Sequence, residues 1–314
     1  MSRFTLDQLR VFLAALASGS VTGAAVELDL AQSTTSSALS EFERALGATL
    51  LERGRFGVRP TAVGTQVARY ARAVLQAAEA LEQSVQLERG DLRGRLRVAA
   101  YRSLATHLLP DLITLFRERH PGVEFEVQSM EGEAHGLEHA LLGGAADLCL
   151  LSGPVYPSLE SVDFAADDWV AVFPLASAPA AKHASWSDLQ RLPFLLCNDA
   201  GAPTVRRYWH HHGQHFQQVA QVEDDSVILA MVEHGFGCSI LARLATLPLP
   251  GGIAVRALPT ALERRLSIAF LPQMQLMPVF SAFLGHIRDP LVLERCTVVR
   301  EGALRTLPVA QYGE

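Results

Sequence analysis

Several features that define other classes of protein are missing from this sequence. No apolar run reaches the roughly 18 residues that a membrane-spanning helix needs. The first residues lead into an amphipathic pattern and not into a signal peptide. The GxSxG, HExxH, GxGxxG and phosphate-loop motifs are all absent. We therefore expect a cytoplasmic protein that is not an enzyme, has no catalytic residues, needs no cofactor and makes no contact with a membrane.

Cysteine is also scarce. The chain has four cysteines, and no two of them have the spacing of a zinc site or a CxxC motif. They are Cys149, Cys197, Cys238 and Cys296. We expect buried, reduced thiols, with a redox switch as the alternative.

An excess of positive charge, the usual sign of a nucleic-acid binder, is absent as well. The net charge is −6, and residues 1–65 hold six arginines and six acidic residues, so this segment is neutral. What is present is a local basic group, in which Arg53, Arg55 and Arg59 lie within seven residues beside Glu52. A DNA-binding function therefore has to rest on where the charges lie and not on their sum.

The N-terminal part of the chain predicts three short helices. With 314 residues, 49% of them hydrophobic, the chain is long enough for two or three globular units. Thr5 and Gln8 form a capping-box pattern before a first helix, which the segment 18–20 ends. A second helix is expected from Val21 to about residue 28, and a third from about Gln32 to Leu46, ending at Gly47.

The third of these helices has a polar first half and an apolar second half. Its apolar positions are Ala38, Leu39, Phe42 and Leu46, which share one face. The candidate DNA-binding side chains of this helix are Gln32, Ser33, Thr34, Ser36, Ser37 and Ser40. A helix-turn-helix reads base edges with the N-terminal residues of its second helix. Thr34, Ser36 and Ser37 are expected to contact bases, and Gln32 with Arg53 to hold phosphates. A merely solvated helix face is the alternative interpretation.

A basic hairpin and a long helix follow. Glycines at 54 and 57 favour a turn, and the three arginines of the basic group, Arg53, Arg55 and Arg59, are candidate phosphate contacts. From Thr61 to about Glu88 apolar residues recur every three or four positions, as in a coiled-coil seam. They are Val67, Ala71, Val74, Ala78, Leu81 and Val85. This pattern predicts pairing with a second copy of the chain, and burial within one chain is the alternative.

Residues 88–94 break the helix, and alternating strands and helices follow. Strands are expected at 96–100, 123–128 and 147–151, with helices at 108–119 and 137–142 between them. This β-α-β-α-β order implies a parallel sheet. A second set of strands is expected at 169–173, 194–197, 219–222, 238–241 and 266–271, with helices at 227–233 and 279–287.

Two stretches resemble the LysR-type transcriptional regulators. The first spans residues 6 to about 88, and its matching residues include Ala24-Ala25, Leu46-Gly47 and Leu50-Leu51-Glu52-Arg53. The second is looser and includes His120-Pro121-Gly122-Val123, Ala146-Asp147-Leu148 and the glycine motif at residues 232–237. The chain departs from the family pattern at Phe42, Leu51, Phe56 and Pro60, and nothing beyond about residue 290 is matched.

The resemblance implies an α+β multidomain protein. Residues 1–65 would form a winged helix-turn-helix, 66–89 a linker and dimerisation helix, and 90–314 a two-lobed α/β domain similar to periplasmic binding proteins. Lobe I would take about 90–163 and 267–314, and lobe II about 164–266. The implied partners are a double-stranded DNA operator, a small-molecule effector and one or three further copies in a homodimer or homotetramer, with RNA polymerase as a further candidate.

An effector would lie between the lobes, where strands end and helices begin. The candidate residues are Tyr101, Arg102, Ser103, Ser129, Glu131, Ser152, Asn198, Thr204 and Asp225. Arg102 could hold a carboxylate, and the acids Glu131, Glu223, Asp224 and Asp225 would favour a ligand that also carries a positive group. A carboxylate or amphoteric metabolite is therefore expected.

Three rival interpretations stay open from the sequence. The chain could be a solute-binding module without DNA-binding activity, against which residues 5–65 argue. The histidines at 210–212 and 215 could bind a metal, although an exposed helix is preferred and no metal site is predicted. The acids at 223–225 could serve catalysis, although they suit a helix N-terminus better.

Overall fold

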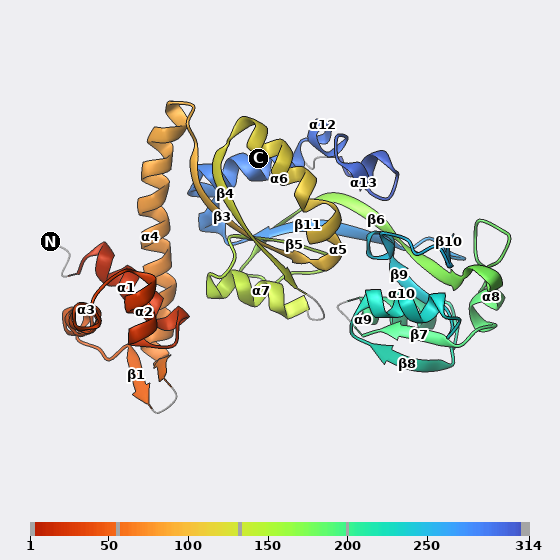
Figure 1. Ribbon diagram of the computed structural model, residues 1–314, viewed down its shortest axis with the longest axis horizontal. Helices are drawn as coiled ribbons and strands as arrows, with labels where there is room; N and C mark the ends of the chain where they lie inside the picture. Colours follow the sequence, from red (N-terminus) through yellow and green to blue (C-terminus); the bar gives the residue numbers. More distant parts are fainter. Residues whose placement is uncertain (1–3, 55–56, 131–133, 199–200, 309–314) are drawn as a thin grey trace. The chain divides into compact units, whose positions relative to one another are not determined.

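A computed structural model describes residues 4–54, 57–130, 134–198 and 201–308, without the side chains of residues 53, 134 and 135 (Figure 1). The contacts divide the chain into two compact units. The N-terminal unit consists of residues 1–92 with two short later segments, 142–144 and 273–278. The C-terminal unit consists of residues 93–141, 145–272 and 279–314.

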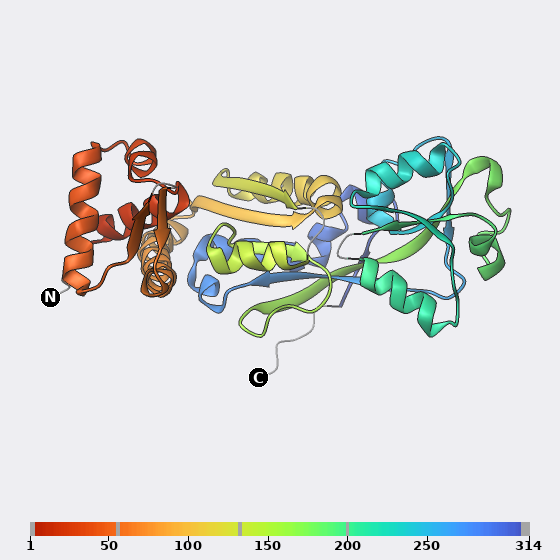
Figure 2. The ribbon, with the colours of Figure 1, turned by 90° about the horizontal axis from the view of Figure 1, so that it is seen from below.

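The three N-terminal helices form as their sequence predicts. They are α1 (Leu6–Ala17), α2 (Val21–Glu27) and α3 (Gln32–Leu46), and Figure 2 shows α3 along the outside of the unit. Thr5 and Gln8 make both bonds of the capping box at the start of α1. The Ser20 hydroxyl caps α2 by accepting from the Gly23 amide at 2.8 Å. Gly47 ends α3 in the left-handed conformation, where a residue without a Cβ is favoured.

A hairpin and a long helix complete this unit. Strands β1 (Leu51–Gly54) and β2 (Gly57–Pro60) are antiparallel, and α4 runs over Ala62–Glu88. Gly57 has a φ of +100°, and a Cβ there would lie 2.4 Å from the Gly19 carbonyl oxygen. The Val58 amide donates to that same oxygen at 2.7 Å. Glycine at this position therefore allows the hairpin to dock on the turn between α1 and α2.

The core of the N-terminal unit anchors α3 by its second half. Leu39 and Phe42 are fully buried, and the Phe42 ring lies 5.5 Å from that of Phe12 on α1. Leu46, in the last turn of the helix, is 38% exposed, so this apolar face is buried at Leu39 and Phe42 and becomes accessible at its end. Leu39 and Phe42 therefore anchor the second half of α3 in the core of the N-terminal unit.

The C-terminal unit is built on one mixed sheet. Its strands are β3 (Arg93–Tyr101), β4 (Gly122–Met130), β5 (Leu148–Leu151), β6 (Glu160–Pro174), β9 (Ser239–Ala242), β10 (Ile253–Ala257), β11 (Glu263–Phe270) and β12 (Arg305–Thr306). The order is β10-β6-β11-β5-β3-β4, with β9 and β12 also paired to β6. Strands β3, β4 and β5 are parallel, as the β-α-β-α-β pattern predicts, whereas β6 and β11 are antiparallel. The long β6 passes from one lobe into the other.

In lobe I, helices cover both faces of the sheet (Figure 1). Helices α5 (Arg102–His107) and α6 (Leu109–Arg119) follow β3, and α11 (Pro278–Arg288) lies beside α6, with the rings of Phe116 and Phe283 5.1 Å apart. Helix α7 (Ala134–Gly143) packs on the opposite face, where Leu137 and Leu141 meet Ala99 of β3. Two short helices, α12 (Pro290–Leu293) and α13 (Thr297–Arg300), lie beyond the part that the family pattern covers.

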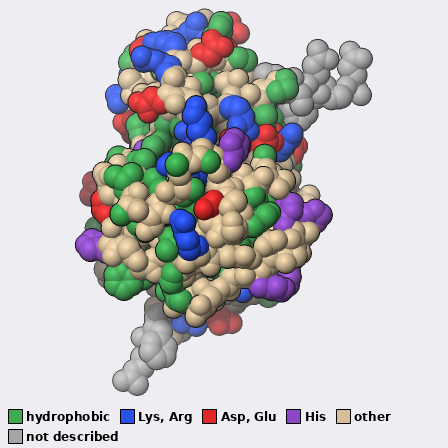
Figure 3. Space-filling model, turned by 90° about the vertical axis from the view of Figure 1, so that its right-hand side faces the viewer, with side chains coloured by type: hydrophobic (Ala, Val, Ile, Leu, Met, Phe, Trp, Pro, Cys, Tyr) green, Lys and Arg blue, Asp and Glu red, His purple; other side chains and the backbone are tan. Residues whose placement is uncertain are grey.

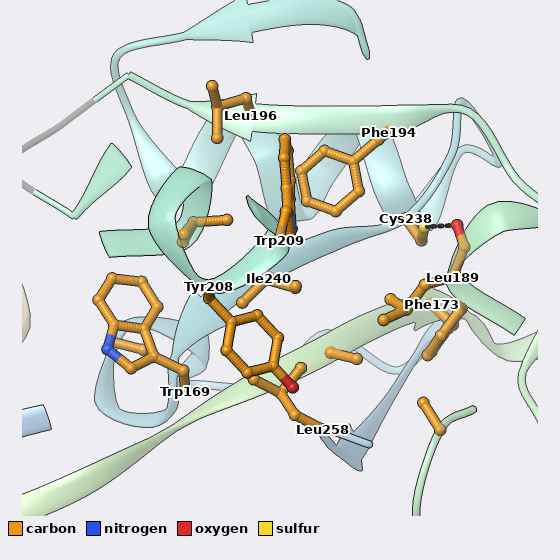
Figure 4. Close-up of a cluster of buried hydrophobic side chains, with 14 of the residues drawn as sticks. Trp169, Phe173, Leu189, Phe194, Leu196, Tyr208, Trp209, Cys238, Ile240 and Leu258 are labelled. Atoms are coloured by element: carbon orange, nitrogen blue, oxygen red, sulfur yellow. Dashed lines mark hydrogen bonds between the residues drawn. The ribbon is translucent and has the colours of Figure 1, made fainter. Parts of the chain in front are cut away.

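Lobe II has an aromatic core between its sheet strands and α9 (Ala202–His211) (Figure 4). The rings of Phe194, on β7 (Phe194–Cys197), and Trp209 meet edge to face at 4.5 Å. Strand β8 (Gln218–Val222) pairs with β7 in parallel. Helix α10 (Asp225–Glu233) covers the other face, and α8 (Trp186–Gln190) begins at the cap residue Ser185.

Several elements differ from the sequence expectation. Strand β6 starts at Glu160 instead of 169, because its charged first half pairs with β11. Strand β10 and helices α5 and α8 were not expected, since each is only five or six residues long. The expected lobe boundaries at 163/164 and 266/267 both fall inside continuous strands, β6 and β11.

Candidate functional site

The first candidate site is the polar half of α3. Gln32, Ser33 and Thr34 are exposed, and the structure gives their side chains no hydrogen bond to another described residue. Thr35, which lies between them and the rest of the helix, is buried and donates to the Ala31 carbonyl at 3.1 Å. Thr35 therefore holds the first turn while its neighbours stay accessible to another molecule.

The next turn of α3 presents hydroxyls that are already partly engaged. Ser37 is exposed and donates to Glu41 at 3.2 Å, and exposed Ser40 donates to the Ser36 carbonyl at 3.0 Å. Each oxygen keeps lone pairs that can accept from a base amino group. Ser36 itself is half-buried, so it is the least accessible of the predicted base-reading residues.

Hydrogen bonds from backbone amides to a side chain of α3 hold the start of the hairpin beside this helix. The Glu43 carboxylate of α3 accepts from the amides of Leu50 and Leu51 at 2.7 and 3.1 Å. Arg59 on β2 is exposed, and Arg53 lies on β1 opposite Val58. Arg55 lies outside the described residues. The hairpin can thus add positive charge beside a polar helix surface, which is the arrangement of a winged helix-turn-helix.

The second candidate site is a cavity of about 300 Å³ inside the C-terminal unit. Residues from both lobes line it, where β3 gives way to α5, after β5, at the start of α9 and before α10. Trp169 of β6, Ile240 of β9 and Met130 of β4 supply apolar surface. Its size is at the lower end of the range of small-molecule sites, which starts at about 300 Å³.

An ion pair crosses this cavity from one lobe to the other. Arg102, the first residue of α5, pairs with Asp225, the first residue of α10. Their side chains are 22% and 15% exposed. Asp224 lies beside them and caps α10 by accepting from the Ser226 amide at 2.7 Å. Hydrogen bonds from Ser226 and the attraction of Arg102 lower the pKa of Asp224, so this carboxylate is also charged at neutral pH.

A second ion pair lies where the strands pass between the lobes. Arg264 of β11 donates to Asp167 of β6 through Nε at 2.6 Å and through a terminal nitrogen at 2.8 Å. Asp167 is fully buried and also accepts from the Leu244 amide at 3.0 Å. The pairing of β6 with β11 shifts register between Leu266 and Ser267, next to this pair. Because Arg264 also lines the cavity, this ion pair joins the cavity wall to the paired strands β6 and β11.

Six of the predicted effector residues line the cavity. They are Tyr101, Arg102, Ser103, Ser152, Thr204 and Asp225. Ser129 and Asn198 are exposed and are not among the lining residues, so the structure does not bring them to this cavity. Both lie at strand ends, but each stands next to a lining residue, Met130 or Cys197, and successive side chains of an extended segment point to opposite sides. Glu131 lies outside the described residues.

Sequence reasoning missed several lining residues, among them Glu138, Trp169, Arg207 and Arg264. Arg207 follows Thr204 by one turn of α9 and donates to its hydroxyl at 3.3 Å, a spacing that the sequence does reveal. Trp169 lies inside β6, and Arg264 is the second residue of β11. No local signal marks such positions, because they reach the cavity only through the pairing of β6 with β11.

The alternative chemistries find no support. Burial raises the pKa of Cys149, of Cys238 to about 12 and of Cys296 to about 11, so these thiols stay protonated at neutral pH. His210, His211 and His215 are exposed, and Figure 3 shows histidine side chains at several separate places on one face of the molecule. Among the described residues, however, no group of three metal-ligating side chains has the geometry to hold an ion.

No single helix in the described part of the chain is long and apolar enough to cross a membrane. Only the pair α1 and α2 passes the test of length and composition together, and the two helices are bent by 119° at their junction. Both contribute to the buried core of the N-terminal unit.

A winged helix-turn-helix joined through a long helix to a two-lobed α/β domain defines a class of ligand-responsive DNA-binding proteins. Comparison with known proteins agrees. Residues 6–65 match the family model of the bacterial regulatory helix-turn-helix proteins of the LysR family, and residues 89–291 match the LysR substrate-binding domain. The chain belongs to the LysR family of DNA-binding transcriptional regulators with an effector-binding domain.

Individual relatives span nearly the whole chain. The probable HTH-type transcriptional regulator LrrA of Synechococcus elongatus is 37% identical over 93% of this chain and 99% of its own length. Full-length OxyR C199D from Pseudomonas aeruginosa shares the fold, with a TM-score of 0.75 and 22% identity over 98% of this chain and 99% of its own. Full-length CbnR complexed with its target DNA aligns with a TM-score of 0.56 and 25% identity over 91% and 99% of the two chains.

Proposed function

We propose that this regulator reads an operator with the first half of α3, holds the DNA backbone with the arginines of the hairpin, and senses a small molecule in the cavity between its lobes. The observation that carries the proposal is the exposed polar surface of α3 on a helix anchored by Leu39 and Phe42. A rigid helix with accessible hydroxyl and amide groups suits the major groove. A regulator and not an enzyme is proposed, acting in the cytoplasm because its operator is chromosomal DNA.

Thr34 provides the sharpest test of base reading. Thr34→Ala removes a side chain that makes no hydrogen bond to a described residue, so the fold of the unit should stay intact. With DNA fragments selected by the wild-type protein from a random pool, affinity should fall about tenfold, whereas affinity for random DNA should fall less than about threefold. Gel shifts at fixed salt give both values. Ser37→Ala should show the same difference between selected and random DNA, with a smaller loss of affinity.

The matched control is Ser84→Ala, which removes an exposed hydroxyl on α4. It should change neither affinity. Equal losses on selected and random DNA for Thr34→Ala would contradict base reading by α3. Failure of the wild-type protein to select any sequence would instead favour the rival interpretation, a solute-binding module.

We further propose that α4 pairs with its copy in a second subunit. Val74, Leu81 and Val85 are 43%, 69% and 49% exposed, although they continue the apolar seam. Val67 and Ala71 pack instead into the core of the N-terminal unit. The first part of the seam is therefore buried within the chain, and the later part is exposed and can pair with a second copy. An apolar stripe of this kind is expected to be covered in the assembly.

Leu81→Glu should convert the dimer into monomers in light scattering at micromolar concentration and weaken operator binding by about tenfold or more. Glu79→Gln, an exposed change on the side of α4 away from the seam that keeps an acceptor for Gln83, is the control and should leave both unchanged. A monomeric wild-type protein would contradict the pairing.

A further inference from the structure

A chain of hydrogen bonds runs from the start of α1 to the exposed surface of α3. The Thr5 amide donates to the side-chain oxygen of Gln8 at 3.0 Å, and the side-chain nitrogen of Gln8 donates to Oε2 of Glu41 at 3.3 Å. The Ser37 hydroxyl donates to Oε1 of the same carboxylate at 3.2 Å. An inference from this chain rests on the proposed reading of DNA by α3, and it specifies which chemical group of a base Ser37 recognises.

The direction of each bond in this chain is determined by its two ends. A backbone N–H can only donate, so it engages the side-chain oxygen of Gln8 and leaves the side-chain nitrogen for Glu41. An ionised carboxylate can only accept, so the proton between Ser37 and Glu41 belongs to the serine. A serine hydroxyl has a single proton, and here that proton is already in use. What Ser37 offers to another molecule is therefore an acceptor.

The base edges in the major groove differ in the groups that they present. Adenine and cytosine carry an amino group, N6 or N4, which donates, whereas the oxygens O6 of guanine and O4 of thymine accept. Glu41 is exposed beside Ser37, and its negative charge attracts an amino group and repels the oxygens of bases and phosphates. The engaged proton of Ser37 and the charge of Glu41 thus favour the same partner.

We propose that Ser37 reads the amino group of an adenine or a cytosine, and that Glu41 is the positioning residue that imposes this choice by holding the serine proton. Thr34 provides the contrast within the same helix. Its side chain makes no hydrogen bond to another described residue, so its hydroxyl can rotate either to donate to a carbonyl oxygen or to accept from an amino group. The restriction on Ser37 comes from its neighbours and not from the hydroxyl itself.

The test uses the full-length protein and DNA fragments that it selects from a random pool. Selection with Ser37→Ala identifies the base pair that Ser37 contacts, because the preference there should relax by about fivefold or more. Two modified duplexes are then made at this base pair. One lacks the amino group, with purine in place of adenine or pyrimidin-2-one in place of cytosine. The other lacks the opposing carbonyl oxygen, with 5-methylpyrimidin-2-one in place of thymine or 2-aminopurine in place of guanine.

Both changes remove the same hydrogen bond between the two bases, so each duplex is the control for the other. In gel shifts at fixed salt, loss of the amino group should weaken binding of the wild type about five- to tenfold, and binding of Ser37→Ala less than about twofold. Loss of the carbonyl oxygen should affect the two proteins equally. A carbonyl effect that depends on Ser37, or no dependence on Ser37 in either duplex, would overturn the proposal.

Glu41→Gln tests the positioning role. Gln8 would donate to the oxygen of the new amide, so the amide nitrogen would face Ser37 and donate to its hydroxyl oxygen. The serine proton is then released and the negative charge is lost. The penalty for removing the amino group should fall from about five- to tenfold to less than about twofold.

Glu27→Gln, which neutralises an exposed glutamate on α2, is the matched control and should keep the full penalty. Loss of one negative charge changes the overall affinity for DNA in both variants, but a change of charge alone does not alter the response to a single base group. An unchanged penalty in Glu41→Gln would overturn the role assigned to Glu41.

The selections also separate this inference from the proposed function. If Thr34→Ala relaxes the preference at a base pair and Ser37→Ala relaxes none, α3 reads DNA but the assignment of Ser37 is wrong. If neither variant relaxes the preference at any position, the proposed reading surface on α3 is itself wrong, and the inference falls with it.

Discussion

The polar side chains of α3 and those of the cavity serve binding in opposite ways. Gln32, Ser33 and Thr34 are exposed and make no hydrogen bond to a described residue. In the cavity, Arg102 is already paired with Asp225, and Arg264 with Asp167. The polar side chains of α3 are therefore accessible to another molecule without rearrangement, whereas the charged side chains of the cavity are already engaged with one another.

This difference bears on how each region is expected to bind its partner, DNA in the case of α3 and a small molecule in the case of the cavity. Side chains that are already hydrated lose few hydrogen bonds when DNA binds. Contacts with the phosphates are expected to supply most of the binding free energy, so the affinity for DNA should depend steeply on salt concentration. Paired groups must first be separated, so a ligand that breaks such a pair has to offset the cost of leaving a largely buried charge without its partner.

The largest expected effect comes from removing the support of α3. Phe42→Ala should lower the free energy of unfolding of the N-terminal unit by about 3–5 kcal/mol, because a fully buried ring beside Phe12 is lost. An exposed reading surface without a rigid core beneath it should not bind an operator. Chemical denaturation followed by circular dichroism at helical wavelengths measures the change.

The control for this prediction is built into the sequence. The three tryptophans, Trp169, Trp186 and Trp209, all belong to the C-terminal unit. Their fluorescence midpoint should stay unchanged in Phe42→Ala. Val26→Ala, which truncates a 78% exposed side chain on α2, should change neither signal. A shift of the tryptophan midpoint by Phe42→Ala would show that the two regions do not unfold separately.

The next effect concerns the paired charges. Asp167→Ala leaves the buried Arg264 guanidinium and the Leu244 amide without their acceptor, which should cost about 3 kcal/mol in the C-terminal unit. Tryptophan fluorescence during denaturation should report it. The exposed ion pair of Arg295 with Glu118, tested by Glu118→Ala, is the control and should cost less than about 1 kcal/mol. Equal costs would mean that burial does not set the strength of these pairs.

The sequence predicts the N-terminal unit better than the C-terminal one, and the reason is the range of the interactions. Caps, glycine ends and helical periodicity are local, so α3 is predicted over Gln32–Leu46, as observed. Strand β6 depends on β11, about a hundred residues away, and its charged first half resembles a loop until Arg264 and Arg265 are placed opposite. Short elements such as α8 and β10 carry no periodic signal of their own.

The same distinction holds for the sites. Residues at the transition from strand to helix, such as Arg102, Thr204 and Asp225, are predictable because the ends of parallel strands collect at one edge of a sheet. Ser129 and Asn198 follow the same rule and still miss the cavity, because their neighbours Met130 and Cys197 take the positions that face it and successive side chains of an extended segment point to opposite sides. Arg264 could be found only from the pairing of β11.

The next smaller effect tests the expected contact between the hairpin of the N-terminal unit and the DNA backbone. Arg59 is exposed on β2 and is expected to contact a phosphate. Arg59→Ala should weaken selected and random DNA equally, by about tenfold or less, and reduce the slope of log affinity against log salt by about 1. Arg69→Ala, an exposed arginine on α4 whose guanidinium stacks over Tyr70, is the comparison and should leave the slope unchanged. A loss confined to the selected sequence would assign Arg59 to base reading.

The smallest expected effect compares like with like, because each region has a helix that begins with a capping box. Thr5 and Gln8 form it at α1, and Ser185 and Asp188 form it at α8. Thr5→Ala should destabilise the N-terminal unit by about 1 kcal/mol and Ser185→Ala the C-terminal unit by a similar amount, because each removes an acceptor for an otherwise unpaired amide. The first change should leave the tryptophan fluorescence midpoint unchanged, whereas the second should shift it, because all three tryptophans, Trp186 of α8 among them, lie in the C-terminal unit. Neither residue belongs to a proposed binding surface, so selected-DNA affinity should stay within about twofold of the wild type when measured on the folded protein. A loss of DNA affinity in Thr5→Ala larger than its loss of stability explains would mean that the entry to α1 also positions α3, and the reading surface would then depend on more than the core beneath it.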